Sequence, residues 1–98
     1  MNPAIETVRA HIWVAGRVQG VGFRAFVQQT AMLIGVAGWV RNVGYNTVEA
    51  LAEGERDKVD RFLQAMKRGP RMSLVEATRE EWEAATGEFS SFEVRRSA

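Results

Sequence analysis

The sequence predicts an α+β fold of the ferredoxin-like, split β-α-β type: an antiparallel sheet (βαββαβ plus a short last strand) with two helices on one face. Three observations support this prediction. Strand and helix patterns follow one another in the order β-α-β, β-α-β, a short hairpin joins the two halves, and no internal repeat interrupts them. With 98 residues, 46% of them hydrophobic, the chain can build one modest core, so we expect a single domain over residues 1–98.

The first half of the chain predicts a strand, a helix and a second strand. Apolar residues alternate with polar or aromatic ones over residues 8–14, which is the period of a half-buried strand. From residue 23 to residue 34 the apolar positions follow helical spacing, and Gly35 is a natural stop. Residues 36–42 then predict the second strand.

The second half repeats this order. A turn at residues 43–46 leads into a third strand at residues 47–53. Apolar side chains from Val59 to Met66 form one helical stripe, which ends at Gly69-Pro70.

The end of the chain predicts two more strands with a connection between them. Residues 75–79 predict a fourth strand, and residues 91–95 a short last one. We expect the acidic stretch between them, residues 80–90, to be a loop.

The glycine-rich stretch from Gly16 to Arg24 lies between the first strand and the first helix. Its three glycines let the backbone turn tightly, and the unpaired N–H groups and dipole of the helix point into it. Such a place binds an anion, usually a phosphate. Arg24 adds a guanidinium that can hold phosphate through two parallel hydrogen bonds. The simpler alternative is a plain strand-to-helix turn with Arg24 solvated.

Three known motifs resemble this loop, and none fits. The dinucleotide fingerprint requires an acidic residue roughly 20 positions on, where this chain has Arg41 and Asn42. The P-loop requires a Lys-Ser/Thr pair after the glycines. The RNA-recognition motif lies on a central strand, whereas residues 22–27 begin a helix and contain an extra residue.

Asn42 is the polar residue that the fold brings to this loop. It has the parity of Val40 on the core-facing side of the second strand, at the strand's end. In a right-handed β-α-β crossover the first two strands are parallel, so this end lies near the glycine loop. Asn42 is therefore either a hydrogen-bonded turn residue or a residue that holds a ligand or water.

Composition excludes several classes of function. There are no cysteines, which excludes disulfides, thiol catalysis and zinc-thiolate sites, and the single histidine excludes a histidine metal cluster. A net charge of +1 gives no general attraction to nucleic acid or membrane. The N-terminus lacks the apolar core of a signal peptide, and the longest near-apolar run, residues 31–40, cannot span a bilayer. We expect a small soluble domain in the cytoplasm.

The other sheet face is expected to carry aromatic and basic side chains. His11 should face solvent there with no chemical role, and Trp13 and Trp39 should form an exposed aromatic surface. Cross-strand packing explains this surface most simply. Together with Arg9 and Arg41 it could instead stack bases, so a nucleic-acid-binding module is the alternative function.

The sequence closely resembles the acylphosphatase family. Gly16 through Arg24 matches every fixed position of the family pattern G-x-V-Q-G-V-x-F-R, and the likeness covers about residues 8–96, including the ending Phe92 to Arg95. A second pattern is matched at Gly38, Trp39, Val40, Asn42, Val48, Glu49, Glu53 and Gly54. The resemblance implies a ferredoxin-like fold and a metal-independent hydrolase of acyl phosphates that needs no cofactor. It further implies a small-molecule substrate and no nucleic-acid or membrane partner, and we expect a monomer.

The resemblance also implies roles for individual residues. Arg24 would bind the substrate phosphate, and Asn42 would position the attacking water. Many members have Asp-Gly in the following hairpin where this chain has Tyr45-Asn46, although asparagine tolerates a left-handed backbone. A family-like domain also occurs inside hydrogenase-maturation carbamoyltransferases, so a binding or transfer module is a third alternative. The backbone amides expected to bind phosphate are those of Arg17, Val18, Gln19, Gly20, Val21, Gly22 and Phe23.

This chemistry suits a site without an acid, a thiol or a metal. An ordinary phosphate ester expels an alkoxide, which needs a general acid or a metal to leave. An acyl phosphate expels a carboxylate whose conjugate acid has a pKa of about 4 to 5, so the leaving group needs no proton. What remains is to hold the phosphoryl group and aim a water in line.

Overall fold

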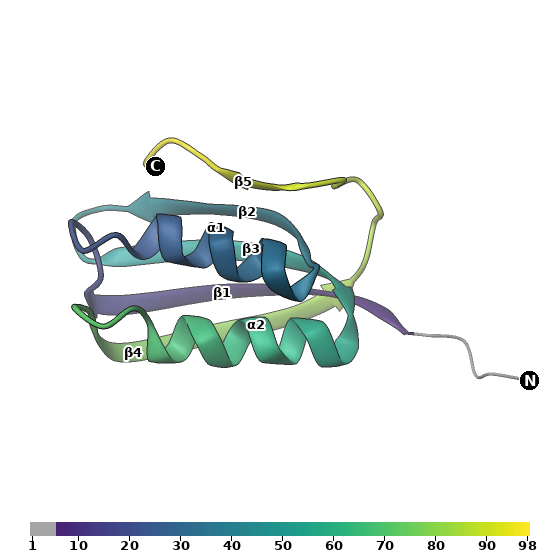
Figure 1. Ribbon diagram of the computed structural model, residues 1–98, viewed down its shortest axis with the longest axis horizontal. Coiled ribbons are helices and arrows are strands. Elements are labelled where there is room, and N and C mark those ends of the chain that lie inside the picture. Colours follow the sequence, from purple (N-terminus) through teal and green to yellow (C-terminus); the bar gives the residue numbers. More distant parts are fainter. Residues whose placement is uncertain (1–5) are drawn as a thin grey trace, which may run out of the picture.

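The computed structural model describes residues 6–98, in which two helices lie side by side on one face of a five-stranded sheet (Figure 1). No helix in this part of the chain is both long and apolar enough to cross a membrane. The elements, in chain order, are β1 (Thr7–Arg17), α1 (Phe23–Ile34), β2 (Ala37–Val43), β3 (Thr47–Glu55), α2 (Arg56–Arg68), β4 (Leu74–Ala84) and β5 (Phe92–Val94).

The sheet has the order β4-β1-β3-β2-β5, which confirms the predicted fold class. The first four strands pair antiparallel, and the short β5 adds to β2 in parallel, so the complete sheet is mixed. Because β1 and β2 both run antiparallel to β3, they are parallel to each other with β3 between them. The loop after β1 and the hairpin after β2 therefore meet at one end of the sheet (Figure 1).

The core lies between the sheet and the helices. Every second residue of β1 from Val8 to Val14 is buried, which confirms the predicted alternation. α2 contributes Phe62, whose ring lies 5.5 Å from the ring of Phe92 on β5. Each large apolar side chain buried in this way contributes roughly 1.5–3 kcal/mol. This core fixes α1 against the sheet and, with it, the loop at the helix N-terminus.

The prediction of a loop over residues 80–90 is wrong for its first half. β4 continues to Ala84 and pairs with β1 as far as Val8. The acidic composition misled the prediction because β4 is an edge strand whose side chains are mostly exposed on both faces. Its backbone is held by β1, and Lys67 of α2 adds an ion pair with Glu80 at 2.6 Å.

The face without helices is more buried than the sequence predicts. Trp39 is only 8% exposed, because the guanidinium groups of Arg41 and Arg95 lie 5.0 and 5.1 Å from its ring centroid. The prediction of an exposed Trp39 is therefore wrong. His11 lies on this face as predicted, where its ring stacks on Trp13 at a centroid distance of 3.9 Å.

A buried carboxylate on this face fastens the connection after β4. Glu53 of β3 is 6% exposed and accepts hydrogen bonds from Arg9 Nε at 2.7 Å, Thr86 N at 2.8 Å and Gly87 N at 3.1 Å. Burial raises the pKa of Glu53, but the hydrogen bonds from Thr86, Arg9 and Gly87 outweigh it, so the pKa lies below its usual value of 4.5. The charged form is therefore the one that the fold stabilises.

We expect Glu53 to make the protein less stable in acid. Since its pKa is lower in the folded than in the unfolded chain, its stabilisation is complete above about pH 5 and is lost as the pH falls below 4.5 and through the lower pKa of the folded state. Glu53→Gln should lower the free energy of unfolding at pH 7 by about 1.5–3 kcal/mol. The free energy of unfolding, measured with urea from pH 7 to pH 3, should differ between the unmodified protein and Glu53→Gln at neutral pH and become similar in acid. Glu76→Gln, at an exposed position of β4, is the control. A difference in unfolding free energy between the unmodified protein and Glu53→Gln that stays constant from pH 7 to pH 3 would contradict the assignment.

Candidate active site

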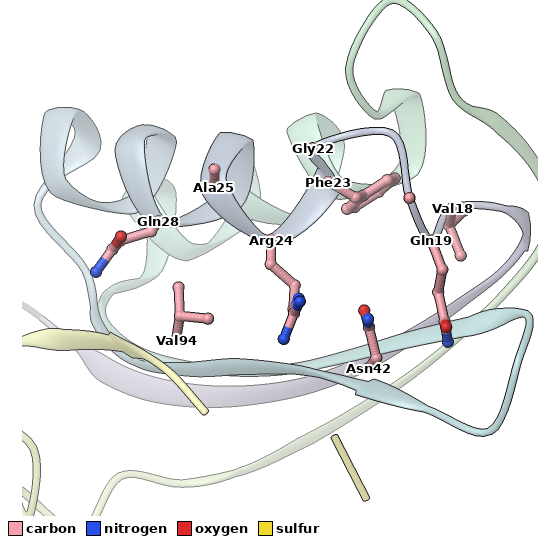
Figure 2. A pocket seen from close by; sticks show the side chains of 10 residues that line it. Val18, Gln19, Gly22, Phe23, Arg24, Ala25, Gln28, Asn42 and Val94 are labelled. Atoms are coloured by element: carbon pink, nitrogen blue, oxygen red, sulfur yellow. The ribbon is translucent and has the colours of Figure 1, made fainter. Parts of the chain in front are cut away.

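A pocket of about 320 Å³ opens where the glycine loop, the start of α1 and the end of β2 meet (Figure 2). Its size is at the lower end of small-molecule sites, which measure roughly 300–1,000 Å³. The pocket is lined by Val18, Gln19, Gly20, Gly22, Phe23, Arg24, Ala25, Gln28, Asn42 and Val94.

The loop lines one side of this pocket and contains backbone N–H groups without a backbone acceptor. Gly20 and Gly22 have φ values of +74° and +76°, a left-handed conformation that side chains disfavour, so glycine is needed at both positions. Gly22 caps α1 without any side-chain hydrogen bond, and the first turn of α1 contains no acidic residue. Within residues 6–98 no backbone carbonyl accepts the N–H groups of Gly20, Val21 or Gly22. Unpaired N–H groups at the N-terminus of a helix favour an anionic ligand.

Arg24 supplies the positive charge of the site. It is half-buried in the first turn of α1, and its side chain points between the helix and the sheet into the pocket (Figure 2). None of the ion pairs formed among residues 6–98 involves Arg24, whereas Arg9 and Arg41 are both paired with carboxylates. Its guanidinium is therefore available to a ligand.

Asn42 places an acceptor beside this guanidinium. Its side chain rises from the end of β2 toward the loop, on the opposite side of the pocket from α1 (Figure 2). Among the described residues, its Oδ1 is the only buried side-chain nitrogen or oxygen without a hydrogen-bond partner. Buried polar atoms without partners are rare in folded proteins and call for an explanation. Here the residue lines the pocket, where its oxygen can accept a hydrogen bond from a ligand or a water.

Gln19 joins the loop to the hairpin that follows Asn42. Its Nε2 lies 2.9 Å from the carbonyl oxygen of Thr47, 3.1 Å from that of Gly44 and 3.3 Å from that of Val43. The sequence singled out only the backbone of Gln19, because no local pattern shows which distant carbonyls a side-chain amide will reach. The side chain thus holds the end of β2 against the loop.

The left-handed residue of the hairpin turn is not Asn46, the residue that the sequence suggests for this conformation. Gly44, with φ +60°, supplies the left-handed residue, and no described residue other than glycine has a positive φ. Asn46 instead accepts the N–H of Gly16 through its backbone carbonyl at 2.9 Å. The departure from Asp-Gly at Tyr45-Asn46 therefore leaves the loop and the hairpin directly bonded.

The structure brings most of the predicted site residues together. Arg24, Asn42, Val18, Gln19, Gly20, Gly22 and Phe23 all line the pocket. Arg17 is exposed at the end of β1, and Val21 packs partly against the core, so neither side chain contributes to the lining. Sequence reasoning did not select Ala25, Gln28 and Val94, which also line it.

We expect Gln19→Leu to reduce kcat by about 10- to 100-fold, because a small displacement of a positioning group is costly in an enzyme site. Inhibition by inorganic phosphate should persist, since the loop amides and Arg24 remain. Amide hydrogen exchange in the hairpin at residues 43–47 should accelerate. Gln29→Leu, on the exposed side of α1, is the matched control. Unchanged kcat with faster exchange would show that the three hydrogen bonds are structural only.

Fold and pocket together define a small α+β domain with a pocket between a helix N-terminus and a strand end. The Acylphosphatase family model matches residues 10–94. An acylphosphatase of Syntrophobacter fumaroxidans is 45% identical over 86 residues, which are 88% of this chain and 89% of the relative. The chain therefore belongs to the acylphosphatase family, whose function is the hydrolysis of acyl phosphates.

Solved structures agree with this membership. The crystal structure of acylphosphatase from Bacillus subtilis has a TM-score of 0.85 and 38% identity, covering 90% of this chain and 98% of that one. Full-length HypF in a phosphate- and nucleotide-bound form also has a TM-score of 0.85, but only 24% identity. The match covers 99% of this chain and 13% of HypF, and at this identity it shows a shared fold.

Proposed function

We propose that this acylphosphatase works without a metal, holding the phosphoryl group against the glycine loop and Arg24 while Asn42 orients the attacking water. The buried, unpartnered Oδ1 of Asn42 in the same pocket as Arg24 carries this proposal. A carbonyl oxygen accepts an O–H of water, which leaves a lone pair of the water oxygen free to face phosphorus.

The reaction needs no further group from the protein. The water oxygen forms a bond to phosphorus as the bond from phosphorus to the acyl oxygen breaks, and the electron pair leaves with the carboxylate. The water proton passes to the phosphate product or to solvent. The lining residues include no Asp, Glu, His or Lys to act as a general acid, which suits a leaving group that departs unprotonated. The loop amides and Arg24 would stabilise the charge on the equatorial oxygens.

The test is phosphate release from benzoyl phosphate in the presence of EDTA, with para-nitrophenyl phosphate as the parallel substrate. Rapid cleavage of the anhydride alone, unchanged by EDTA, is the expected result. Loss of activity on chelation, restored by a divalent cation, would overturn metal independence. Comparable cleavage of the ester would overturn the argument from the leaving group.

We also propose that the enzyme is a monomer that acts in the cytoplasm and binds no nucleic acid. The net charge is only +1, and the guanidinium groups of Arg41 and Arg95 cover the ring of Trp39, which supports the absence of base stacking. Light scattering should give a mass near 11.0 kDa. Titration with single-stranded RNA at two salt concentrations should show no salt-dependent binding.

A further inference from the structure

The pocket extends beyond the part that a phosphoryl group would occupy. In Figure 2 Arg24 lies in the middle, with Asn42 and Gln19 on one side and Val94, Ala25 and Gln28 on the other. The first side holds the loop amides and the unpartnered oxygen of Asn42. The second side contains no charged residue. The two sides of the pocket therefore offer different chemistry to a ligand.

The geometry of phosphoryl transfer assigns the second side. The attacking and leaving oxygens lie roughly in line through phosphorus, on opposite sides of it. If Asn42 holds the water, the leaving carboxylate points away from Asn42, past Arg24 and toward Val94. The acyl group must then lie between α1 and β5.

Two apolar side chains, Val94 and Ala25, line this region, and a hydrogen bond from Gln28 holds its two walls together. Val94 lies next to Val40 in the sheet and is 41% exposed, so part of its side chain is free to contact a ligand. Ala25 is exposed one turn before Gln28 on α1. Gln28 Nε2 donates to the carbonyl oxygen of Phe92 at 3.3 Å, which ties β5 to the helix and fixes the width of the groove.

We infer that Ala25, Gln28 and Val94 form an acyl-binding subsite that favours flat or short uncharged acyl groups over acyl groups bearing a second anion. This inference rests on the proposed function. Val94 and Ala25 offer apolar contact to a benzoyl or butyryl group. Arg24 is the only cation in the lining, and the phosphoryl group uses it, so a second carboxylate or phosphate would find no partner.

The first test compares benzoyl phosphate with acetyl phosphate in Val94→Thr. Threonine keeps the shape and the strand preference of valine but replaces a methyl with a hydroxyl. We expect kcat/KM for benzoyl phosphate to fall about three- to tenfold. Removing one methyl or methylene contact in a closed apolar pocket costs about tenfold or more, and the loss should be smaller here because the groove is open. Acetyl phosphate, which has only a methyl group to contact Val94, should change by less than about twofold on the same scale. Leu33→Ala, an apolar truncation at an 88% exposed position of α1, should change neither.

The second test reverses the preference. Val94→Lys should raise kcat/KM for succinyl phosphate relative to benzoyl phosphate by about two- to fivefold, the range of a partly exposed ion pair. Such a gain cannot come from misfolding. Equal changes for all acyl phosphates, or none, would overturn the subsite.

The competitive inhibition constant of inorganic phosphate separates the two proposals. In Val94→Thr it should stay constant, because the loop and Arg24 are untouched. If the unmodified protein cleaves no acyl phosphate, the proposed function fails. If it cleaves them all and Val94→Thr does not distinguish benzoyl from acetyl phosphate, only the subsite fails.

Discussion

Replacing Arg24 with alanine is expected to lower kcat/KM for benzoyl phosphate by roughly 10³-fold or more, the scale of an arginine that stabilises transferring phosphoryl groups. Arg24 is the only cation in the pocket lining, so no neighbouring side chain can take over its charge. Inhibition by inorganic phosphate should be lost together with turnover, because the same guanidinium would bind both ligands.

Three further measurements make this prediction specific. Arg24→Lys should recover little activity, because an ammonium group cannot reproduce the planar pair of donors. Arg61→Ala, on the exposed side of α2, should be fully active. Since Arg24 forms no ion pair within the described chain, thermal unfolding of Arg24→Ala should match that of the unmodified protein. Retained phosphate inhibition in Arg24→Ala would show that the loop amides alone bind the anion.

Asn42→Ala is expected to separate turnover from binding. Loss of the group proposed to orient the water should reduce kcat by roughly 10²- to 10³-fold, as removal of a preorganised polar group does in other enzymes. The inhibition constant of phosphate should change little, because the loop and Arg24 remain. Steady-state kinetics and phosphate inhibition measured on one preparation give both results.

Stability should respond to Asn42→Ala in the opposite sense. The substitution removes a buried acceptor that has no partner within the described chain, and an unsatisfied buried acceptor costs about 1–3 kcal/mol. The melting temperature should therefore hold or rise while activity falls, which is typical of residues kept for function. A near-normal kcat would contradict the water-orienting role of Asn42. A large loss of stability together with a near-normal kcat would show that Asn42 is structural.

The parts of the fold that local sequence patterns specify were predicted well. The bounds of α1 are those predicted, because Gly22 and Gly35 mark its ends and the apolar spacing between them is regular. The predicted β4 ended five residues too early, since an edge strand needs no buried face and so leaves no alternation to detect. Trp39 was expected to be exposed because strand parity shows which face a residue takes but not which guanidinium groups will cover it.

The candidate site likewise contains features that the sequence predicts and features that only the structure shows. The glycine loop and Asn42 could be found because the loop is continuous in sequence and the crossover rule places the end of β2 beside it. The side-chain hydrogen bonds of Gln19 and the position of Val94 depend on contacts between residues far apart in the chain. No periodicity or composition encodes such contacts, so they required the three-dimensional structure.

The two edges of the sheet, β4 and β5, are the places where a strand of another molecule could add. An open strand edge is a template on which another chain can add a strand, the first step of aggregation. At one edge β5 has only three residues, too few for stable pairing with a strand of another molecule. At the other, β4 is long but carries Arg79, Glu81 and Glu83, so an arriving strand would have to bury or displace hydrated charges. We therefore expect the charged residues that obscured β4 in the sequence to disfavour the addition of a strand at this edge.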